Sequence, residues 1–246
     1  MQIAPPFGYK EIVPLNRAQK IRLLAPGEIP EFARALNAVP ISYTEFALVA
    51  REYPIVFTAT GEAKSFAPVA ALGMQNGENL YNQGNAWASG VYVPAYVRRF
   101  PFCMSRVTID KVEQQNRLIC VEKSHIDDQA GELLFDAKGQ PGEKWKTIEK
   151  LLTDYEGDLE RSREMCGILA DYGLFEPFTM QAKFSQGGGP VAMTGMFRVA
   201  EDKIEHLNAA QLKNLVKKGI LSRVYAHLLS LGNFANLLDR KAAKAV

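Results

Sequence analysis

Cysteine is scarce in this sequence, and neither sign of charge is in clear excess. The three cysteines, Cys103, Cys120 and Cys166, are odd in number and far apart, which excludes a disulfide framework and the usual zinc-binding spacings. The chain carries 29 basic and 27 acidic residues, and this formal net charge of +2 argues against a strongly basic nucleic-acid-binding protein. Because 47% of the residues are hydrophobic, the chain can build a core, which excludes disorder as its main state.

Long apolar runs are missing as well. No window approaches ~18 uninterrupted apolar residues, so we predict no membrane-spanning helix. Residues 1–15 lack a charged segment followed by an apolar stretch, so we predict no classical signal peptide. All three cysteines have apolar neighbours, which is typical of buried, reduced thiols. These features favour a cytoplasmic location, and non-classical export to the cell surface is the alternative.

The common catalytic motifs do not occur. The sequence contains no Gly-x-Gly-x-x-Gly pattern and no Gly-x-Ser-x-Gly nucleophile elbow. Its one glycine cluster, Gly187-Gly188-Gly189, is followed by Pro190 and a strand-like run. That arrangement predicts a hairpin turn, because a phosphate-binding loop needs its glycines to open a helix.

The hydrophobic period indicates the fold. Residues 1–30 are rich in proline and predict an extended arm. Short apolar runs separated by turn signals predict largely antiparallel strands within 53–136 and 177–199. From Glu143 to Tyr172 apolar residues recur every three or four positions, which predicts a long amphipathic helix that ends at Gly173. Residues 200–246 predict a helical C-terminal segment. The expected fold class is α+β, a single domain over 1–246 with one mixed, largely antiparallel sheet.

Three local signals add detail. Ser42 and Glu45 have the spacing of a capping box, which predicts a short helix that ends near Glu52. Residues 102–110 and 117–122 predict a hairpin. Pro68 within the strand-like run 66–74 predicts an edge strand, because proline has no N–H for a second ladder.

A His-x-Asp pair suggests one metal site. His125 and Asp127 have the spacing found in non-haem Fe(II) oxygenases, in which two histidines and one carboxylate hold the iron. His206 or His227 would be the third ligand. The other interpretation is that His125 lies in an exposed turn and that His227 packs in the core beside an apolar helix stripe.

Two segments combine arginine, proline and aromatic residues, namely 51–54 and 91–101. Guanidinium groups bind carboxylates and stack on aromatic rings. One interpretation is therefore a recognition surface that uses Arg51, Tyr96, Arg98 and Arg99. The other is a structural corner in which Glu45 or Glu52 neutralises the arginines.

At these segments the sequence resembles the bacterial SapC family, and the resemblance recurs over nearly the whole chain. The segments that carry it are LNAVP (36–40), REYPIVF (51–57), FAPVAALG (66–73), ENLY (78–81), YVPAYVRRFPF (92–102), LFEP (174–177), TGMFRV (194–199) and YAHLLSLGN (225–233).

The resemblance implies a surface-layer or secretion association, or a role beside a peptide-modifying or uptake system, and it implies no catalytic residue set. We therefore expect a non-enzymatic accessory protein without a cofactor. It would bind a protein or peptide through Arg51, Tyr96, Arg98 and Arg99, and would not bind nucleic acid. Self-association through an exposed apolar stripe is a further expectation. The alternative is an Fe(II)-dependent oxygenase built on the His-x-Asp pair.

Overall fold

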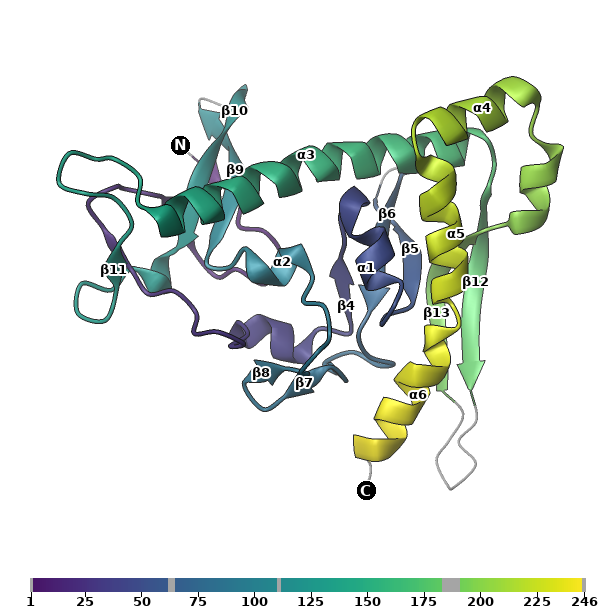
Figure 1. Cartoon of the computed structure of the whole chain (residues 1–246), viewed down its shortest axis with the longest axis horizontal. Coiled ribbons are helices and arrows are strands. Elements are labelled where there is room, and N and C mark those ends of the chain that lie inside the picture. The colour runs from purple at the N-terminus through teal and green to yellow at the C-terminus, as the bar shows by residue number, and fades with distance from the viewer. Residues whose placement is uncertain (1, 62–64, 110–111, 183–190, 245–246) are drawn as a thin grey trace.

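The computed structural model describes residues 2–61, 65–109, 112–182 and 191–244 and confirms the α+β class (Figure 1). The strands form two main antiparallel sheets where the sequence predicted one. The four-stranded sheet has the order β1-β9-β10-β2, with bounds Gln2–Ile3, Phe102–Ile109, Val112–Glu122 and Ile12–Pro14. The five-stranded sheet has the order β12-β13-β5-β6-β4, with bounds Phe175–Ala182, Val191–Val199, Ile55–Ala59, Phe66–Ala71 and Ala38–Pro40.

The predicted N-terminal arm lies along the body of the protein. Its strands β1 and β2 extend the predicted β9–β10 hairpin on both edges. Its third strand, β3 (Lys20–Ile21), pairs with β11 (Glu132–Leu133), and a further two-stranded ribbon joins β7 (Asn82–Gln83) to β8 (Ala86–Trp87). The arm is therefore held by backbone hydrogen bonds along much of its length.

The long helix α3 (Glu143–Asp171) confirms the predicted amphipathic helix and spans both sheets (Figure 1). Its N-terminal half packs Trp145 and Leu152 into the smaller core, with Phe102. Its C-terminal half packs Tyr155 and Leu169 into the larger core, which contains most of the five-stranded sheet. Among the described residues, no helix has the length and apolar character needed to cross a membrane.

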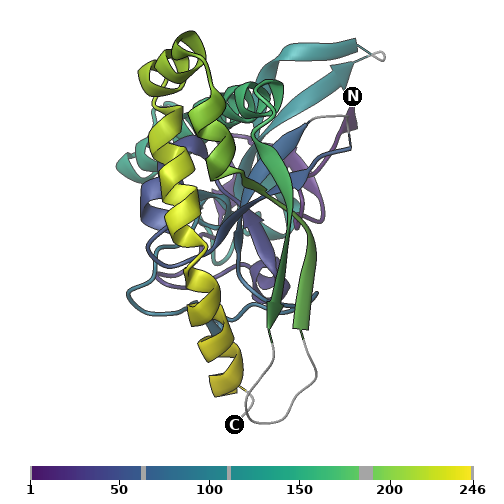
Figure 2. The same ribbon diagram turned by 90° about the vertical axis from the view of Figure 1, so that its right-hand side faces the viewer.

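The C-terminal segment is helical, as predicted, but interrupted. It contains the 3₁₀ turn η4 (Glu201–His206) and the helices α4 (Ala209–Lys217), α5 (Ile220–Ser230) and α6 (Asn233–Lys244). Figure 2 shows α5 and α6 running alongside the β12–β13 hairpin, where the rings of Phe178 and Phe234 lie 5.8 Å apart.

Of the local sequence signals, the capping box was confirmed, whereas the prediction of an edge strand at Pro68 was wrong. Ser42 and Glu45 form the predicted capping box at the start of η2 (Tyr43–Glu45), which continues into α1 (Phe46–Val49). Pro68, in contrast, does not mark an edge, because β6 lies between β5 and β4. Pro68 can occupy this place because β4 ends at Pro40, and Ile41 still donates a backbone hydrogen bond to the Pro68 carbonyl.

The glycine run 187–189, predicted to form a hairpin turn, lies outside the described residues. The remaining short helices are η1 (Glu31–Ala35), α2 (Ala95–Arg98) and η3 (Lys123–His125).

His227 lies on α5, outside the five-stranded sheet, and bridges two of the strands of that sheet. The pairs Met196–Thr58 and Phe197–Phe57 join β13 to β5, and the same register places Val199 opposite Ile55. There the imidazole of His227 lies between the strands. Its Nε2 accepts a hydrogen bond from the Val199 N–H (3.1 Å), and its Nδ1 donates to the Ile55 carbonyl (2.8 Å). The side chain therefore replaces a direct bond of the ladder.

Two further polar residues near His227, Ser230 and Asn233, also bind backbone groups at or just before β5. Ser230 Oγ accepts a hydrogen bond from the Ile55 N–H (2.9 Å), so both backbone groups of Ile55 bind α5. Asn233 Nδ2 donates to the carbonyls of Ala50 (2.8 Å) and Tyr53 (3.2 Å). The spacing of 227, 230 and 233 places all three on one side of the helical segment.

The bridging role requires a neutral imidazole. Burial lowers the pKa of His227 from 6.5 to about 4. Because the unfolded chain takes up a proton at a higher pH than the native protein does, the free energy of unfolding falls as pH drops from about 6.5 to about 4, by roughly 3 kcal/mol from this group.

We therefore predict that His227→Leu lowers the free energy of unfolding by about 4 kcal/mol at pH 7, because it leaves the buried Val199 N–H and Ile55 carbonyl without partners. His227→Gln keeps a donor and an acceptor but does not titrate, so it flattens the decline in stability between pH 6.5 and 4. Urea unfolding at several pH values measures both effects. The control is His206→Gln on an exposed histidine, and a His227→Gln variant with the wild-type pH dependence would contradict the prediction.

Candidate functional site

The four residues predicted to bind a partner do not share one surface. Arg51 and Arg98 are exposed, whereas Tyr96 and Arg99 are buried, at 5% and 4% exposure. Arg98 is the last residue of α2, and its side chain folds back along the preceding segment. Its Nε donates to the Val93 carbonyl and its Nη2 to the Tyr92 hydroxyl, both at 2.9 Å. The prediction that Tyr96 and Arg99 face a partner from the surface therefore needs correction.

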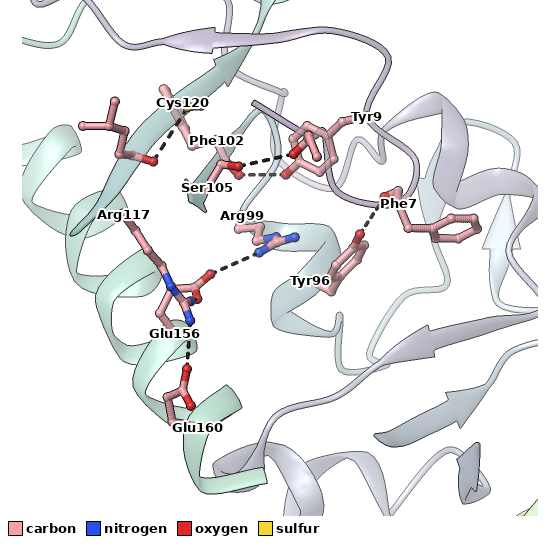
Figure 3. Close-up of polar contacts among 12 residues, drawn as sticks. Phe7, Tyr9, Tyr96, Arg99, Phe102, Ser105, Arg117, Cys120, Glu156 and Glu160 are labelled. Carbon is pink, nitrogen blue, oxygen red and sulfur yellow. Dashed lines mark hydrogen bonds and ion pairs between the residues drawn. The ribbon is translucent and has the colours of Figure 1, made fainter. Parts of the chain in front are cut away.

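Arg99 lies in a cage of three tyrosines. Its guanidinium carbon is 4.3 Å from the ring centre of Tyr96, 4.9 Å from that of Tyr155 and 5.8 Å from that of Tyr9. Figure 3 shows the side chain pointing toward Glu156 on α3, with a nitrogen-to-oxygen distance of 3.7 Å. Cation–π contacts of this kind gain strength when water is removed from them.

The charges around Arg99 are not balanced one to one. Glu156 also forms an ion pair with Arg117, so one largely buried carboxylate serves two guanidinium groups. Arg117 contacts a second acid, Glu160 (2.8 Å), but that side chain is 58% exposed. In addition, Arg99 Nε is buried and has no hydrogen-bond partner within the described residues.

The tyrosines of the cage fix the N-terminal arm. Tyr96 donates its hydroxyl hydrogen to the Phe7 carbonyl (2.6 Å), and Tyr9 donates to the Phe102 carbonyl (2.7 Å). Burial raises the pKa of Tyr9, Tyr96 and Tyr155 above the ordinary value. All three are therefore neutral at pH 7 and offer π faces, and no anionic oxygen, to Arg99.

Glu45 does not neutralise the arginines as the structural interpretation of the sequence supposed. Its Oε1 accepts hydrogen bonds from the Tyr92 hydroxyl (2.9 Å) and the Ala95 N–H (2.6 Å), and its Oε2 accepts from the N–H and hydroxyl of Ser42. Arg98 reaches this carboxylate only through the Tyr92 hydroxyl. Glu45 therefore ties the start of η2 to the start of α2.

The described residues do not form the predicted iron site. No group of three His, Cys, Asp or Glu side chains within the described ranges lies close enough to hold a metal ion. His125 contacts the Arg22 carbonyl with Nδ1 (2.7 Å) and the Arg22 guanidinium with Nε2 (3.1 Å), and both ring nitrogens of His227 bind backbone. Asp127 accepts two backbone N–H bonds in an exposed turn, and His206 lies exposed beside Glu205. Both buried imidazoles thus have structural partners in place of a metal.

The cysteines are poorly suited to nucleophilic chemistry. All three are buried free thiols. Burial raises the pKa of Cys103 to about 12, that of Cys120 to about 11 and that of Cys166 to about 12. Since the thiolate is the reactive form, these side chains are inert at neutral pH.

The sequence reasoning missed the partners of Arg99. Tyr155 belonged to the predicted apolar stripe of the long helix, but nothing marked Glu156 or Tyr9 as its neighbours in space. No motif spacing could have done so, because the cage combines the arm, α2 and α3.

Two glutamates on α3 give a matched test of this cluster. We predict that Glu156→Gln lowers the free energy of unfolding by about 3 kcal/mol, because it leaves buried Arg99 without its carboxylate. Glu160→Gln, one helical turn away and exposed, should cost less than about 1 kcal/mol. Denaturant unfolding of both variants at pH 7 checks the difference, and equal losses would show that burial of the Arg99 pair is energetically unimportant.

Comparisons with known proteins agree with the resemblance seen in the sequence. The model of one family, SapC, matches residues 19–237, which is most of the chain. A comparison with curated proteins found no match, and a comparison with solved structures found none either. The matched range includes Tyr96, Arg99, Tyr155 and Glu156. It does not include Tyr9 or the strands β1 and β2 of the arm. The chain belongs to the SapC family.

Proposed function

We propose that this SapC-family protein is a non-catalytic accessory component, without a cofactor, that docks a protein or peptide partner. The proposal rests on exposed apolar side chains of two neighbouring helices, α1 and α5, and on two exposed arginines, which in our proposal form one face. We call it the α1/α5 face and define it by Leu48, Arg51, Arg98, Tyr225 and Leu229.

The two helices of this face are held side by side. Arg223 of α5 donates to the Tyr43 carbonyl at the start of η2 (3.4 Å), and Asn233 donates to the Ala50 carbonyl at the other end (2.8 Å). Leu48, Tyr225 and Leu229 are exposed by 41%, 43% and 79%. Large apolar side chains this exposed on neighbouring helices are typical of interaction surfaces.

Arginines border the apolar residues. Arg51 follows α1, and Arg98 is joined to the start of α1 through Tyr92 and Glu45. Among the described residues, no carboxylate forms an ion pair with either arginine. Tyrosine and arginine are the residues most enriched at energetically important contacts. A partner that presents carboxylates beside apolar side chains fits this face.

The state of the reactive side chains supports a non-catalytic role. His125, His227 and Glu45 each have their polar atoms bound to backbone or to neighbouring side chains. The three thiols have raised pKa values. The two buried histidines, the thiols and this glutamate thus serve the packing of the protein, which supports a role in binding.

We predict that a photo-cross-linking residue at Leu229 captures one defined partner in the native cell. Leu133, 55% exposed on β11, is the matched control position and should give no such adduct. The double substitution Arg51→Glu/Arg98→Glu should reduce the adduct at least about tenfold, because it reverses the charges that a carboxylate would contact.

The control for the charge reversal is Lys138→Glu/Lys150→Glu, on exposed lysines outside the α1/α5 face. An adduct that survives the arginine reversal, or that falls equally in the lysine control, would contradict docking through this face. An adduct of twice the chain mass would identify a second copy as the partner, in accord with the expected self-association.

We also propose a cytoplasmic location, which the three buried thiols support. Fractionation of the native cells should place the protein with cytoplasmic markers. A signal at the cell surface or in the medium, with those markers absent, would instead favour the surface-layer role associated with the family name.

A further inference from the structure

Cys103 and Cys120 lie directly opposite each other in the β9–β10 hairpin. Two residues along the same register, Glu122 donates its backbone N–H to the Pro101 carbonyl (2.9 Å), so the cysteines also occupy a hydrogen-bonded pair of the ladder. The Cα atoms of such a pair are about 5.5 Å apart. Disulfide-bonded cysteines have Cα atoms about 4.4–6.8 Å apart. The register of the hairpin therefore permits a disulfide between the two thiols.

The two thiols lie on the face of this sheet that the long helix does not cover. Phe102, the neighbour of Cys103, packs with the residues of α3 in the smaller core. Because successive side chains of a strand point to opposite faces, Cys103 and Cys120 point away from α3. They pack instead with Tyr9 and Ile12 of the N-terminal arm. The arm therefore shields the pair from solvent.

The arm is held by short strands at a chain terminus. Strand β1 pairs with β9 through two residues, and β2 pairs with β10 through three. Terminal segments with few backbone bonds open at a lower free energy than core strands do. Both cysteines are 0% exposed while the arm is in place. Local opening of the arm would thus expose them and leave the hairpin that carries them paired.

Arg99 makes Cys103 the more reactive of the two thiols once burial is relieved. Burial raises the pKa of Cys103 to about 12, the charge of Arg99 acts in the opposite direction, and Cys120 and Glu122 raise it further. Burial raises the pKa of Cys120 to about 11, and no arginine opposes it there. Since burial is the main cause at both positions, opening of the arm lowers both pKa values. The nearby guanidinium then stabilises the thiolate of Cys103.

We propose that Cys103 and Cys120 are a redox-responsive pair, shielded by the N-terminal arm, that closes to a disulfide when the arm detaches. The oxidant is a low-molecular-weight disulfide of the glutathione type. The Cys103 thiolate attacks one sulfur of the oxidant and releases one thiolate. Cys120 loses its proton to solvent, attacks the Cys103 sulfur of the mixed disulfide and releases the second thiolate. The protein loses two electrons and two protons, and the oxidant becomes two thiols.

The geometry of the pair suits reversible oxidation. Opposite residues of an antiparallel pair have Cβ atoms about 4.5–5.5 Å apart, whereas a relaxed disulfide needs about 3.8 Å. The bond formed here is therefore strained, and strained disulfides are easily reduced and are typical of regulatory sites. Closure also changes the surface on which Tyr9 and Ile12 pack, so the oxidised form disfavours return of the arm. A transient disulfide of this kind agrees with the proposed cytoplasmic location.

The test is the rate at which the full chain forms this bond with excess oxidised glutathione, followed by mass spectrometry of unreduced peptides. Ile12→Ser removes an apolar contact of the arm with the cysteines. Tyr9→Phe removes the hydrogen bond to the Phe102 carbonyl (2.7 Å) but keeps the ring. We expect the disulfide to form at least about tenfold faster in Ile12→Ser than in the wild type, and about threefold faster in Tyr9→Phe.

Two further variants test the order of the steps. Cys120→Ser should stop at a mixed disulfide of glutathione on Cys103, because the resolving thiol is missing. Cys103→Ser should form its mixed disulfide at Cys120 at least about threefold more slowly, because that thiol lacks the arginine. Equal rates in the two variants would overturn the assignment of Cys103 as the attacking thiol.

Cys166 is the matched control, since it is a buried thiol of α3 whose pKa is also raised to about 12. Cys166→Ser should leave the rate unchanged. Leu215→Ala, a truncation in the larger core, weakens the fold outside the arm and should accelerate oxidation less than Ile12→Ser does.

Three results would overturn the proposal. They are the absence of a 103–120 disulfide in the wild type and both arm variants, a wild-type rate in both arm variants, and equal acceleration by Leu215→Ala. If Ile12→Ser fails to fold, Tyr9→Phe decides, because its ring still fills the core. None of these residues belongs to the α1/α5 face, so the outcome is independent of the docking function.

Discussion

His227 holds together the two strands at the centre of the five-stranded sheet, and the position of the C-terminal helices depends on it. Its imidazole joins the Val199 N–H to the Ile55 carbonyl, while Ser230 and Asn233 bind the chain just before and at the start of β5. Apolar packing alone would allow a helix to slide or rotate on the sheet, whereas directed hydrogen bonds fix both its register and its rotation. Because these polar side chains point inward, Tyr225 and Leu229 on the same helix point outward.

The segments that carry the family resemblance meet one another inside the protein. Residues 225–233 bind residues 50–55 through His227, Ser230 and Asn233. Tyr53 then donates its hydroxyl to the Tyr92 carbonyl (2.6 Å) and accepts from the indole of Trp87 (2.8 Å). A buried network in which each donor has an acceptor specifies one arrangement of the chain, because a half-satisfied alternative is costly. Tyr53 and His227 of these segments thus have structural roles.

Sequence reasoning predicted what depends on local pattern. The period of three and four residues gave α3, and the Ser42–Glu45 spacing gave the capping box, since both signals involve neighbours along the chain. The division into two sheets was missed, because no local pattern indicates that β1 and β2 of the arm pair with the distant strands β9 and β10. Arg98 and Arg99 look equivalent in the sequence. They differ because successive helical side chains point about 100° apart, so one faces solvent and the other faces Tyr155 and Glu156.

The α2 turn places one arginine at the surface and the next in the interior. Arg98 is exposed and is part of the proposed α1/α5 face, whereas Arg99, its neighbour, is buried among three tyrosines. Glu45 binds the first N–H of the same turn and, through Tyr92, contacts Arg98. Any change in how Arg99 is bound therefore acts on the same helical turn that carries Arg98.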